Sequence, residues 1–540
     1  MHRPLLLAFS IATLASAQLR PDGATASFKG SLPPKPTAAL SAEQEAGIEK
    51  QLAAVTADFQ TMKKHLRAAD AEIFLKAVRY ALDFDEWYDK KPEDGVKKAT
   101  ALLEEAKKRI ASLKENKTPW MDGSGQKVLG FYSAIDGSAQ PYGVEVPEGL
   151  EFGKGKKQVP MWIWLHGRGD TATDLHFVYS RLNAKKPGQF QPKGTIVIHP
   201  FGRYCNGWKS AGETDVFEAR DDAKARFNVD ENRIALAGFS MGGAGAWHIG
   251  AHFADQWACV HTGAGFVDVK RYQKLTPEKM PPWYEQTLWG VYDVPDYARN
   301  FMNVPLISYS GENDSQRDSA EYMTEVLAKE GITRPHLIGP GMGHKYHPEV
   351  AKEVQALVER AVEKGRTPPS ARVNFSYQTR TLEYPNNLSP LVEINSLEEH
   401  WKDSRLDSQY DAKTKALTLA TVNLAELQID PAKMTPPVVV EKLIVDGQDV
   451  GPANVQNASS ASSWKIHKET GKWSSGGRSV PGGLSKKVLT GPMDAAFLDS
   501  FLVVLPDGES PNKAVAEWVN IESQHFIARW RSLMRGDPKV

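Results

Sequence analysis

The sequence predicts an α/β fold, a doubly wound and mostly parallel sheet, preceded by a helical segment and followed by a β-rich domain. Two observations support this fold class. Short apolar runs alternate with stretches of helical periodicity between about residues 127 and 365, a pattern that favours parallel strands covered by helices on both faces. The periodicity is purely helical before this region and typical of strands after it, so the chain divides into at least three parts.

Length and charge set further bounds on the class of protein. A chain of 540 residues exceeds one ordinary core, and two to four domains are expected. Lys plus Arg and Asp plus Glu both number 66, so the net charge points neither to a nucleic acid nor to an anionic membrane as partner.

The N-terminus has the pattern of an export signal. A short polar start precedes an apolar run at residues 5–14, and Ala-Ser-Ala at 15–17 resembles a cleavage site. This run is too short to span a bilayer, and no later run is long enough. We therefore expect a signal peptide at 1–17 and a periplasmic or secreted protein, followed by a Pro- and Ser-containing linker at 18–38.

A helical bundle is predicted at 39–118. Ser41 and Gln44 have the spacing of a capping box. Apolar residues then recur at helical intervals within 52–66, 72–88 and 96–113. Its many Lys and Glu residues are interpreted as a solvated face.

The α/β domain is predicted at 119–366. Its expected buried strands are residues 161–165, 195–199, 233–237, 257–261, 305–309 and 335–339. Its expected helices include residues 216–227, 243–253, 315–330 and 348–364.

The remaining chain is predicted to contain a β-rich domain at 367–470 and, at 471–540, a linker with one βα unit. That unit consists of an apolar run at 501–505 and a helix at 514–534. A single βα unit needs a neighbouring strand. Either it pairs with the β-rich domain or the sequence is a truncated piece of a longer protein, and truncation is favoured.

One serine stands between glycines after the apolar run at 233–237. The stretch Gly238-Phe-Ser240-Met-Gly242 fits G-x-S-x-G and lies between a predicted strand and a predicted helix, the context of a nucleophile elbow. Gly238 and Gly242 leave room for a tight turn that exposes the hydroxyl of Ser240. The alternative is a purely structural role, in which the glycines only let the start of the helix pack closely against its neighbours.

An acid and a histidine follow in the order that the α/β-hydrolase topology requires. Asp314 comes after the strand at 305–309 and is the acid candidate, with Glu312 and Asp318 as alternatives. His344 comes after the strand at 335–339 and is the base candidate, with His347 as the second choice. The order Ser240, Asp314, His344 predicts an α/β hydrolase with a catalytic triad.

The expected roles follow from charge. His344 takes the proton of Ser240 and returns it to the leaving group, while Asp314 orients the imidazole. The oxyanion needs two N–H donors, which we expect from the amides of Met241 and Arg168. His166, at the same strand end as Arg168, is interpreted as shaping the loop.

Leu165-His-Gly-Arg-Gly, Gly-Phe-Ser-Met-Gly-Gly and Gly-Met-Gly-His resemble the catalytic domain of prolyl-oligopeptidase-type (S9-like) α/β hydrolases, and also their esterase and polyhydroxybutyrate-depolymerase relatives. The resemblance covers about residues 125–365 and implies the fold and the triad more than the substrate. True prolyl oligopeptidases carry a β-propeller before this domain. Here a short helical segment stands in its place.

Aromatic residues are candidates for the substrate pocket. Trp208 follows a strand end, and Trp283 and Trp289 lie in an insertion between two strands. These rings either bind an apolar, aromatic or sugar group or pack the insertion onto the domain. The sequence predicts no metal site and no cofactor. Cys205 and Cys259 form either one disulfide or two buried thiols.

We therefore expect an exported serine hydrolase that forms an acyl-enzyme, with a carboxylic ester as the preferred substrate, such as a small molecule or a decorated polysaccharide. An S9-like serine peptidase is the alternative. A binding or scaffold protein with a hydrolase-fold platform is the third hypothesis, against which the complete triad argues.

Overall fold

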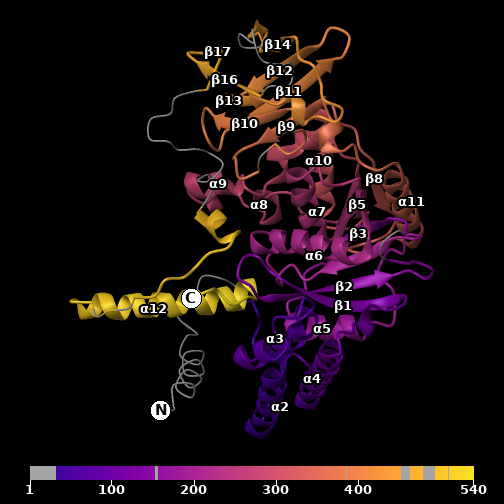
Figure 1. Cartoon of the computed structure of the whole chain (residues 1–540), viewed down its shortest axis with the longest axis vertical. Coiled ribbons are helices and arrows are strands. Elements are labelled where there is room, and N and C mark those ends of the chain that lie inside the picture. The colour runs from indigo at the N-terminus through magenta and orange to yellow at the C-terminus, as the bar shows by residue number, and fades with distance from the viewer. Residues whose placement is uncertain are drawn as a thin grey trace. The chain divides into compact units, whose positions relative to one another are not determined.

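The computed structural model describes residues 32–540 except 153–155, 385, 452–462, 478–492, 507 and 509. The predicted signal peptide and the first part of the predicted linker, up to residue 31, lie outside the described residues. The chain divides into two compact units (Figure 1). The first unit comprises Met1–Lys157, Arg168–Asn228 and Ala496–Val540, and the second comprises Gln158–Gly167 and Val229–Ala495.

Three helices begin the first unit, as the sequence predicts. They are α2 (Ala42–Gln60), α3 (Ala69–Asp83) and α4 (Pro92–Lys114). The capping box is present, since Ser41 Oγ accepts from the Gln44 amide and the Gln44 side chain accepts from the Ser41 amide. The apolar stripes of the three helices bury residues such as Phe59, Phe74 and Leu103 in one core, and this burial stabilises the helices.

Three antiparallel strands of the first unit follow in the order β1-β2-β4. They are β1 (Gly125–Tyr132), β2 (Ala139–Val146) and β4 (Ile196–Pro200), accompanied by α5 (Asp174–Leu182) and α6 (Ala211–Phe227). Helix α3 packs closely on β1, because a Cβ on Gly130 would lie 2.5 Å from the Ala69 carbonyl oxygen. β1 and β2 were not predicted, since glycine and polar residues interrupt their apolar runs.

The C-terminal part of the first unit differs from the prediction. Its helix is α12 (Lys513–Arg529), which continues into a π-helical turn at Trp530–Met534. The strand expected at 501–505 is wrong: only an isolated bridge joins Leu502 to Lys539. Leu502 and Val504 are 65% and 82% exposed, so this apolar run lacks the strand partners that burial in a sheet requires.

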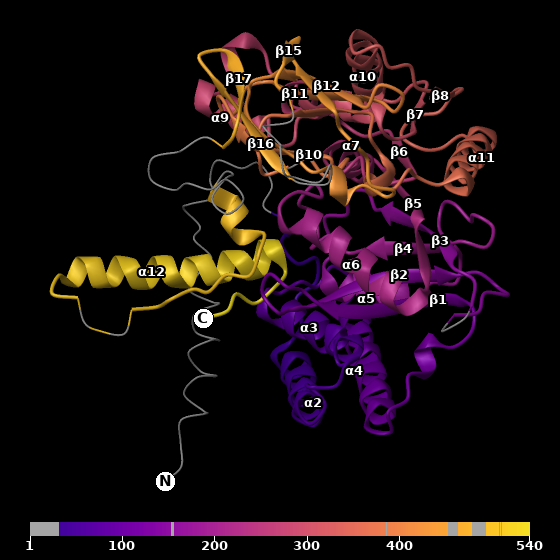
Figure 2. The same ribbon diagram turned by 45° about the horizontal axis from the view of Figure 1, so that its top comes forward.

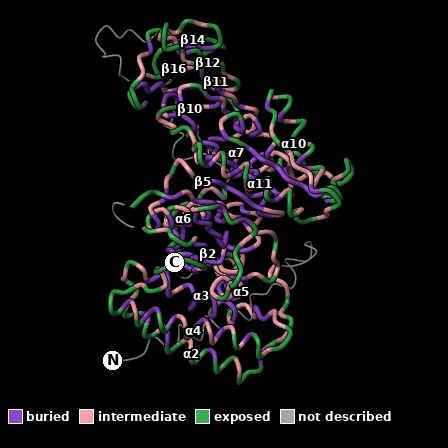
Figure 3. Tube along the Cα trace, turned by 90° about the vertical axis from the view of Figure 1, so that its right-hand side faces the viewer, coloured by how far each residue is buried: buried purple, intermediate pink, exposed green. Residues whose placement is uncertain are grey.

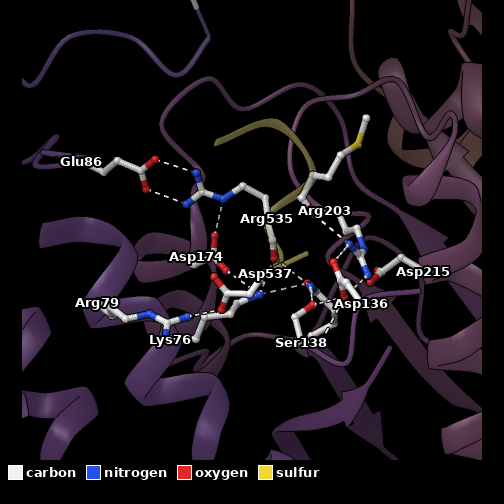
Figure 4. Close-up of polar contacts among 12 residues, drawn as sticks. Lys76, Arg79, Glu86, Asp136, Ser138, Asp174, Arg203, Asp215, Arg535 and Asp537 are labelled. Carbon is white, nitrogen blue, oxygen red and sulfur yellow. Dashed lines mark hydrogen bonds and ion pairs between the residues drawn. The ribbon is translucent and has the colours of Figure 1, made fainter. Parts of the chain in front are cut away.

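The segment 530–537 is nevertheless tied into the first unit by buried charged groups (Figure 4). Asp136 accepts hydrogen bonds from Arg203 Nη1 at 2.8 Å and from Trp530 Nε1 at 2.9 Å. Arg203 also donates to the Met534 carbonyl at 3.0 Å. Burial alone raises the pKa of Asp136, but the guanidinium of Arg203 outweighs it and holds this pKa at about 2.

The second unit contains five parallel strands in the order β3-β5-β6-β7-β8 (Figure 2). They are β3 (Val159–Leu165), β5 (Val229–Phe239), β6 (Cys259–Gly263), β7 (Leu306–Gly311) and β8 (His336–Gly339). The crossing helices are α7 (Met241–His252), α10 (Arg317–Lys329) and α11 (Pro348–Lys364). This arrangement confirms the predicted α/β fold.

The centre of the second unit is its most buried part. All twelve residues of α7 are buried, as the purple trace beside β5 shows (Figure 3). Both α7 and α11 contact β5 and β6. An insertion between β6 and β7 forms α8 (Val269–Tyr272), α9 (Trp283–Trp289) and a 3₁₀ helix at Val294–Met302.

A β-rich part completes the second unit, as predicted. Its two sheets have the strand orders β15-β14-β12-β11-β9 and β10-β13-β16-β17. Their bounds are β9 (Phe375–Thr379), β10 (Val392–Leu397), β11 (Ser404–Asp411), β12 (Ala416–Val422), β13 (Leu424–Ile429), β14 (Lys442–Val445), β15 (Gln448–Asp449), β16 (Trp464–Glu469) and β17 (Lys472–Ser475).

Two further expectations concern membranes and cysteines. The membrane expectation is tested by the helices: among the described residues, none of them combines the length and the apolar character needed to cross a bilayer. Cys205 and Cys259 are both free thiols. Cys259 is buried as expected, but Cys205 is only partly buried, which corrects the expectation of two buried thiols.

Candidate active site

Ser240 lies in a sharp turn between β5 and α7. Its backbone has φ 60° and ψ −121°, a left-handed conformation that a residue with a side chain adopts only at a cost. The turn is held because the Ser240 amide donates to the Gly263 carbonyl at 2.8 Å, and the Ser240 carbonyl accepts from the Ala244 amide at 3.0 Å. The hydroxyl therefore projects from a fixed backbone at the start of a buried helix.

The glycines around Ser240 are required by close backbone approaches. A Cβ on Gly238 would lie 2.1 Å from the Gly242 carbonyl oxygen, and one on Gly242 would lie 1.9 Å from the Leu165 carbonyl oxygen. Neither distance is compatible with a side-chain carbon. The glycine pattern of the motif thus has a steric cause.

The structure brings together the three side chains that the sequence predicts. His344 Nε2 lies 2.8 Å from Ser240 Oγ, and His344 Nδ1 lies 2.9 Å from Asp314 Oδ2. The Asp314 side chain is 1% exposed and that of His344 is 44% exposed. Asp314 Oδ1 accepts from the Gln316 amide at 2.9 Å, which orients the carboxylate toward the imidazole.

The alternative acids, Glu312 and Asp318, and the alternative base, His347, are not aligned with Ser240 in the structure. Glu312 Oε2 accepts from the Gly341 amide at 2.6 Å. Asp318 is exposed in the first turn of α10. His347 precedes α11, and its amide donates to the hydroxyl of Tyr309 at 2.8 Å. Asp314 and His344 are the acid and the base that line up with Ser240.

The two predicted oxyanion donors belong to different units. Met241 is the first residue of α7 and is buried, so its amide belongs to the N-terminal turn of that helix. In the second unit Gly167 approaches Ser240, because a Cβ on Gly167 would lie 3.4 Å from the serine Cβ. Arg168, which opens the next stretch of the first unit, pairs its exposed side chain with Asp170.

The three predicted pocket tryptophans differ in burial. Trp208 is 1% exposed, and its ring packs on Gly202 inside the first unit. Trp283 is 76% exposed on α9, and Trp289, at the end of the same helix, is half-buried. A role in substrate contact stays a prediction for all three.

Two aromatic residues near His344, Phe239 and Tyr346, were not predicted from the sequence. The ring of Phe239 lies 4.9 Å from the imidazole of His344 and 4.8 Å from the ring of Tyr346, measured between centroids. Phe239 precedes the nucleophile and Tyr346 follows the histidine by two positions. Their closeness to the two motifs in the sequence was the only available signal.

Comparison with known proteins bears on the identity of this site. Residues 203–362 match the family model described as the prolyl oligopeptidase family (peptidase S9). A bifunctional acetylxylan esterase/xylanase from Neocallimastix patriciarum is 26% identical over 229 residues, which cover 40% of this chain. The match spans 33% of that relative, so the chain corresponds to about a third of its length.

Solved structures that match part of this chain include an S-formylglutathione hydrolase from Staphylococcus aureus, 18% identical with a TM-score of 0.33 over 45% of this chain and 100% of that protein. A dipeptidyl peptidase 4 from Porphyromonas gingivalis is 14% identical with a TM-score of 0.34, over 45% and 36% of the two chains. The family match includes Ser240, Asp314 and His344. Over residues 203–362 the chain is therefore similar to the prolyl oligopeptidase family, and this similarity supports an S9-like serine hydrolase with the α/β fold.

Proposed function

We propose that this chain hydrolyses carboxylic esters through an acyl-enzyme formed on Ser240. One observation carries the proposal: the uninterrupted line from Ser240 Oγ through His344 to Asp314, at 2.8 Å and 2.9 Å. A serine hydroxyl is a weak nucleophile unless a neighbouring base takes its proton. The third hypothesis, a non-catalytic scaffold, gives no reason for this alignment or for the strained backbone at Ser240.

The proposed reaction has two halves. Ser240 Oγ bonds to the carbonyl carbon while its proton passes to His344 Nε2, and the same proton then leaves with the alcohol as the ester C–O bond breaks. Water next gives its proton to His344 and attacks the acyl carbon, which releases the acid and restores Ser240. Throughout, Asp314 accepts from His344 Nδ1 and stabilises the imidazolium.

The negative charge on the carbonyl oxygen requires N–H donors. We assign one of these to the amide of Met241, worth about 3 kcal/mol of transition-state stabilisation by analogy with other oxyanion holes, and the Arg168 amide stays the second donor expected from the sequence. Support comes from the position of Met241 at the N-terminus of α7 and from the approach of Gly167, the neighbour of Arg168, to Ser240.

An ester is the preferred substrate for two reasons. The sequence relative from Neocallimastix patriciarum is in part an acetylxylan esterase. In addition, the described residues before the family match form helices, the antiparallel strands β1, β2 and β4 and the parallel strand β3, and this element order differs from the repeated four-stranded blades of a propeller-type oligopeptidase. A serine peptidase is the second candidate, favoured by the name of the matching family.

The decisive experiment uses a fluorophosphonate probe, which reacts with activated serines. The wild type should be labelled and Ser240→Ala should not. Ser112→Ala is a matched control, because Ser112 is a helix residue that donates to the Lys108 carbonyl, and it should be labelled like the wild type. A panel of p-nitrophenyl esters and aminoacyl amides then separates the two substrate classes. Turnover of the amides alone would replace the ester proposal with the peptidase.

Export is the remaining part of the proposal and depends on the signal-like pattern of residues 1–17. N-terminal sequencing of the protein recovered from its natural host should find Gln18 as the first residue. A mature chain that keeps residues 1–17 in the cytoplasm would contradict export.

A further inference from the structure

The loop that carries His344 is anchored on a buried tyrosine of β7. Tyr309 is 0% exposed, and its hydroxyl donates to the Lys345 carbonyl at 2.9 Å while it accepts from the His347 amide at 2.8 Å. Gly339 makes room for this hydroxyl, since a Cβ there would lie 2.2 Å from it. The backbone on the C-terminal side of His344 is thus held at two points.

A second tyrosine, Tyr346, points from this loop toward the sheet. Its ring stacks on that of Tyr309, with centroids 4.5 Å apart and an angle of 28° between the planes. On another side it contacts Phe239, whose ring also contacts the imidazole of His344. Tyr346 is therefore linked to His344 in two ways, through the loop backbone and through the ring of Phe239.

The hydroxyl of Tyr346 is paired with a buried histidine of β6. His261 Nε2 lies 2.7 Å from this hydroxyl, and His261 Nδ1 lies 3.0 Å from the Ile307 carbonyl oxygen. A carbonyl only accepts, so Nδ1 carries the proton and Nε2 accepts from Tyr346. Burial lowers the pKa of His261 to about 4, which keeps the imidazole neutral and in this tautomer near pH 7.

Gly263 connects the pair to the nucleophile. A Cβ on Gly263 would lie 2.3 Å from the Tyr346 hydroxyl, and the Gly263 carbonyl accepts from the Ser240 amide. One residue of β6 thus contacts both the serine turn and the side chain that anchors the histidine loop. The distance between Ser240 and His344 is set from this common point.

We propose that Tyr346, held by His261, is a positioning residue that keeps His344 within hydrogen-bonding distance of Ser240. The inference rests on the proposed function of Ser240 and His344 and extends it to two residues outside the predicted triad. Tyr346 touches neither substrate nor the reacting atoms in this role. It acts through the loop and through Phe239.

Tyr346→Phe tests the proposal, because it keeps the stacked ring and removes only the hydroxyl. We expect kcat on a p-nitrophenyl ester to fall about 10- to 100-fold with KM unchanged, as small misplacements of catalytic groups do. The melting temperature should fall by only a few degrees, because His261 Nε2 loses its donor while the stacked ring remains. Tyr410→Phe is the matched control, since its hydroxyl also donates a single bond of 2.7 Å, to the Val439 carbonyl on the β-rich part, and kcat should not change.

Two further readouts separate positioning from general destabilisation. The low-field proton resonance of the His344 Nδ1–H bond to Asp314 should shift or broaden in Tyr346→Phe and stay unchanged in Tyr410→Phe. His261→Leu should lower kcat by a similar factor, because it removes the same hydrogen bond as Tyr346→Phe. For the same reason, kcat of the double variant should be no lower than that of either single variant.

The outcomes are distinguishable. Fluorophosphonate labelling of the wild type with full kcat in Tyr346→Phe would overturn the positioning role alone. Additive losses in the double variant would also overturn it. A wild type that the probe does not label would overturn the proposed function, and this inference with it.

Discussion

Arg535 donates two hydrogen bonds of 2.7 Å to the carboxylate of Glu86, a residue 449 positions earlier in the chain (Figure 4). Its Nε donates to Asp174 at 2.6 Å, and its carbonyl accepts from Lys76 at 2.8 Å. The side chains of Arg535, Glu86 and Asp174 are at most 1% exposed. A buried cation between two buried carboxylates joins segments from three parts of the sequence.

Arg535→Met should therefore be strongly destabilising, because it leaves Glu86 buried without its counter-charge and leaves Asp174 with Lys76 alone, 3.2 Å away. We expect the free energy of unfolding to fall by about 3–5 kcal/mol, measured by urea denaturation. Lys107→Met is the control, since its ion pair with Glu104 is about half exposed and should contribute less than about 1 kcal/mol. Equal effects of the two substitutions would contradict the burial argument.

Gly242→Ala should disrupt the serine turn. Its Cβ would lie 1.9 Å from the Leu165 carbonyl oxygen and 2.8 Å from that of His166, and backbone atoms cannot move aside like a flexible side chain. We expect labelling by the fluorophosphonate probe at least about 100-fold slower than in the wild type.

The same substitution in a surface helix serves as the control for Gly242→Ala. Gly47 lies inside α2 with nothing within 4 Å of its Cβ position, and Gly47→Ala should stabilise the protein by about 1 kcal/mol. Normal labelling of Gly242→Ala would show that the turn tolerates a side chain.

Asp314→Asn should lower kcat by about 10⁴-fold, because the amide no longer stabilises the imidazolium and favours the wrong tautomer of His344. The measurement is ester hydrolysis under saturating substrate. Asp318→Asn removes an exposed carboxylate four positions away and should leave kcat unchanged. A larger loss in Asp318→Asn than in Asp314→Asn would mean that the acid is misassigned.

His261 should make stability depend on pH. Burial lowers its pKa from 6.5 to about 4 in the folded state, so the unfolded chain binds a proton between these values and the folded chain does not. The resulting stabilisation is present above pH 6.5 and is lost as the pH falls toward 4, up to about 3 kcal/mol in total.

Comparing the free energy of unfolding of the wild type with that of His261→Leu isolates this effect of His261. The free energy of unfolding should decline more steeply in the wild type than in His261→Leu between pH 6.5 and 4, by up to about 1.4 kcal/mol per pH unit. Urea denaturation at several pH values measures it. Parallel pH profiles would show that His261 takes up its proton equally in both states.

The sequence alone was enough to predict Ser240, Asp314 and His344, because each stands at the end of an apolar run with turn-forming glycines beside it. In a parallel sheet such strand ends meet at one edge, so local patterns locate residues that are 30 and 104 positions apart in the chain. The same local logic failed at 501–505, where an apolar run has no strand to pair with.

Apolar periodicity and glycine spacing thus determined the α/β fold, the serine turn and the order of the three aligned side chains. The tertiary structure decided which groups hold them: Tyr346 against His261, and Arg535 between Glu86 and Asp174. Such contacts join residues that are 85 and 449 positions apart. Their energy comes from burial and from complementary charge, which arise only once the chain has folded. These contacts therefore cannot be predicted from any local sequence pattern.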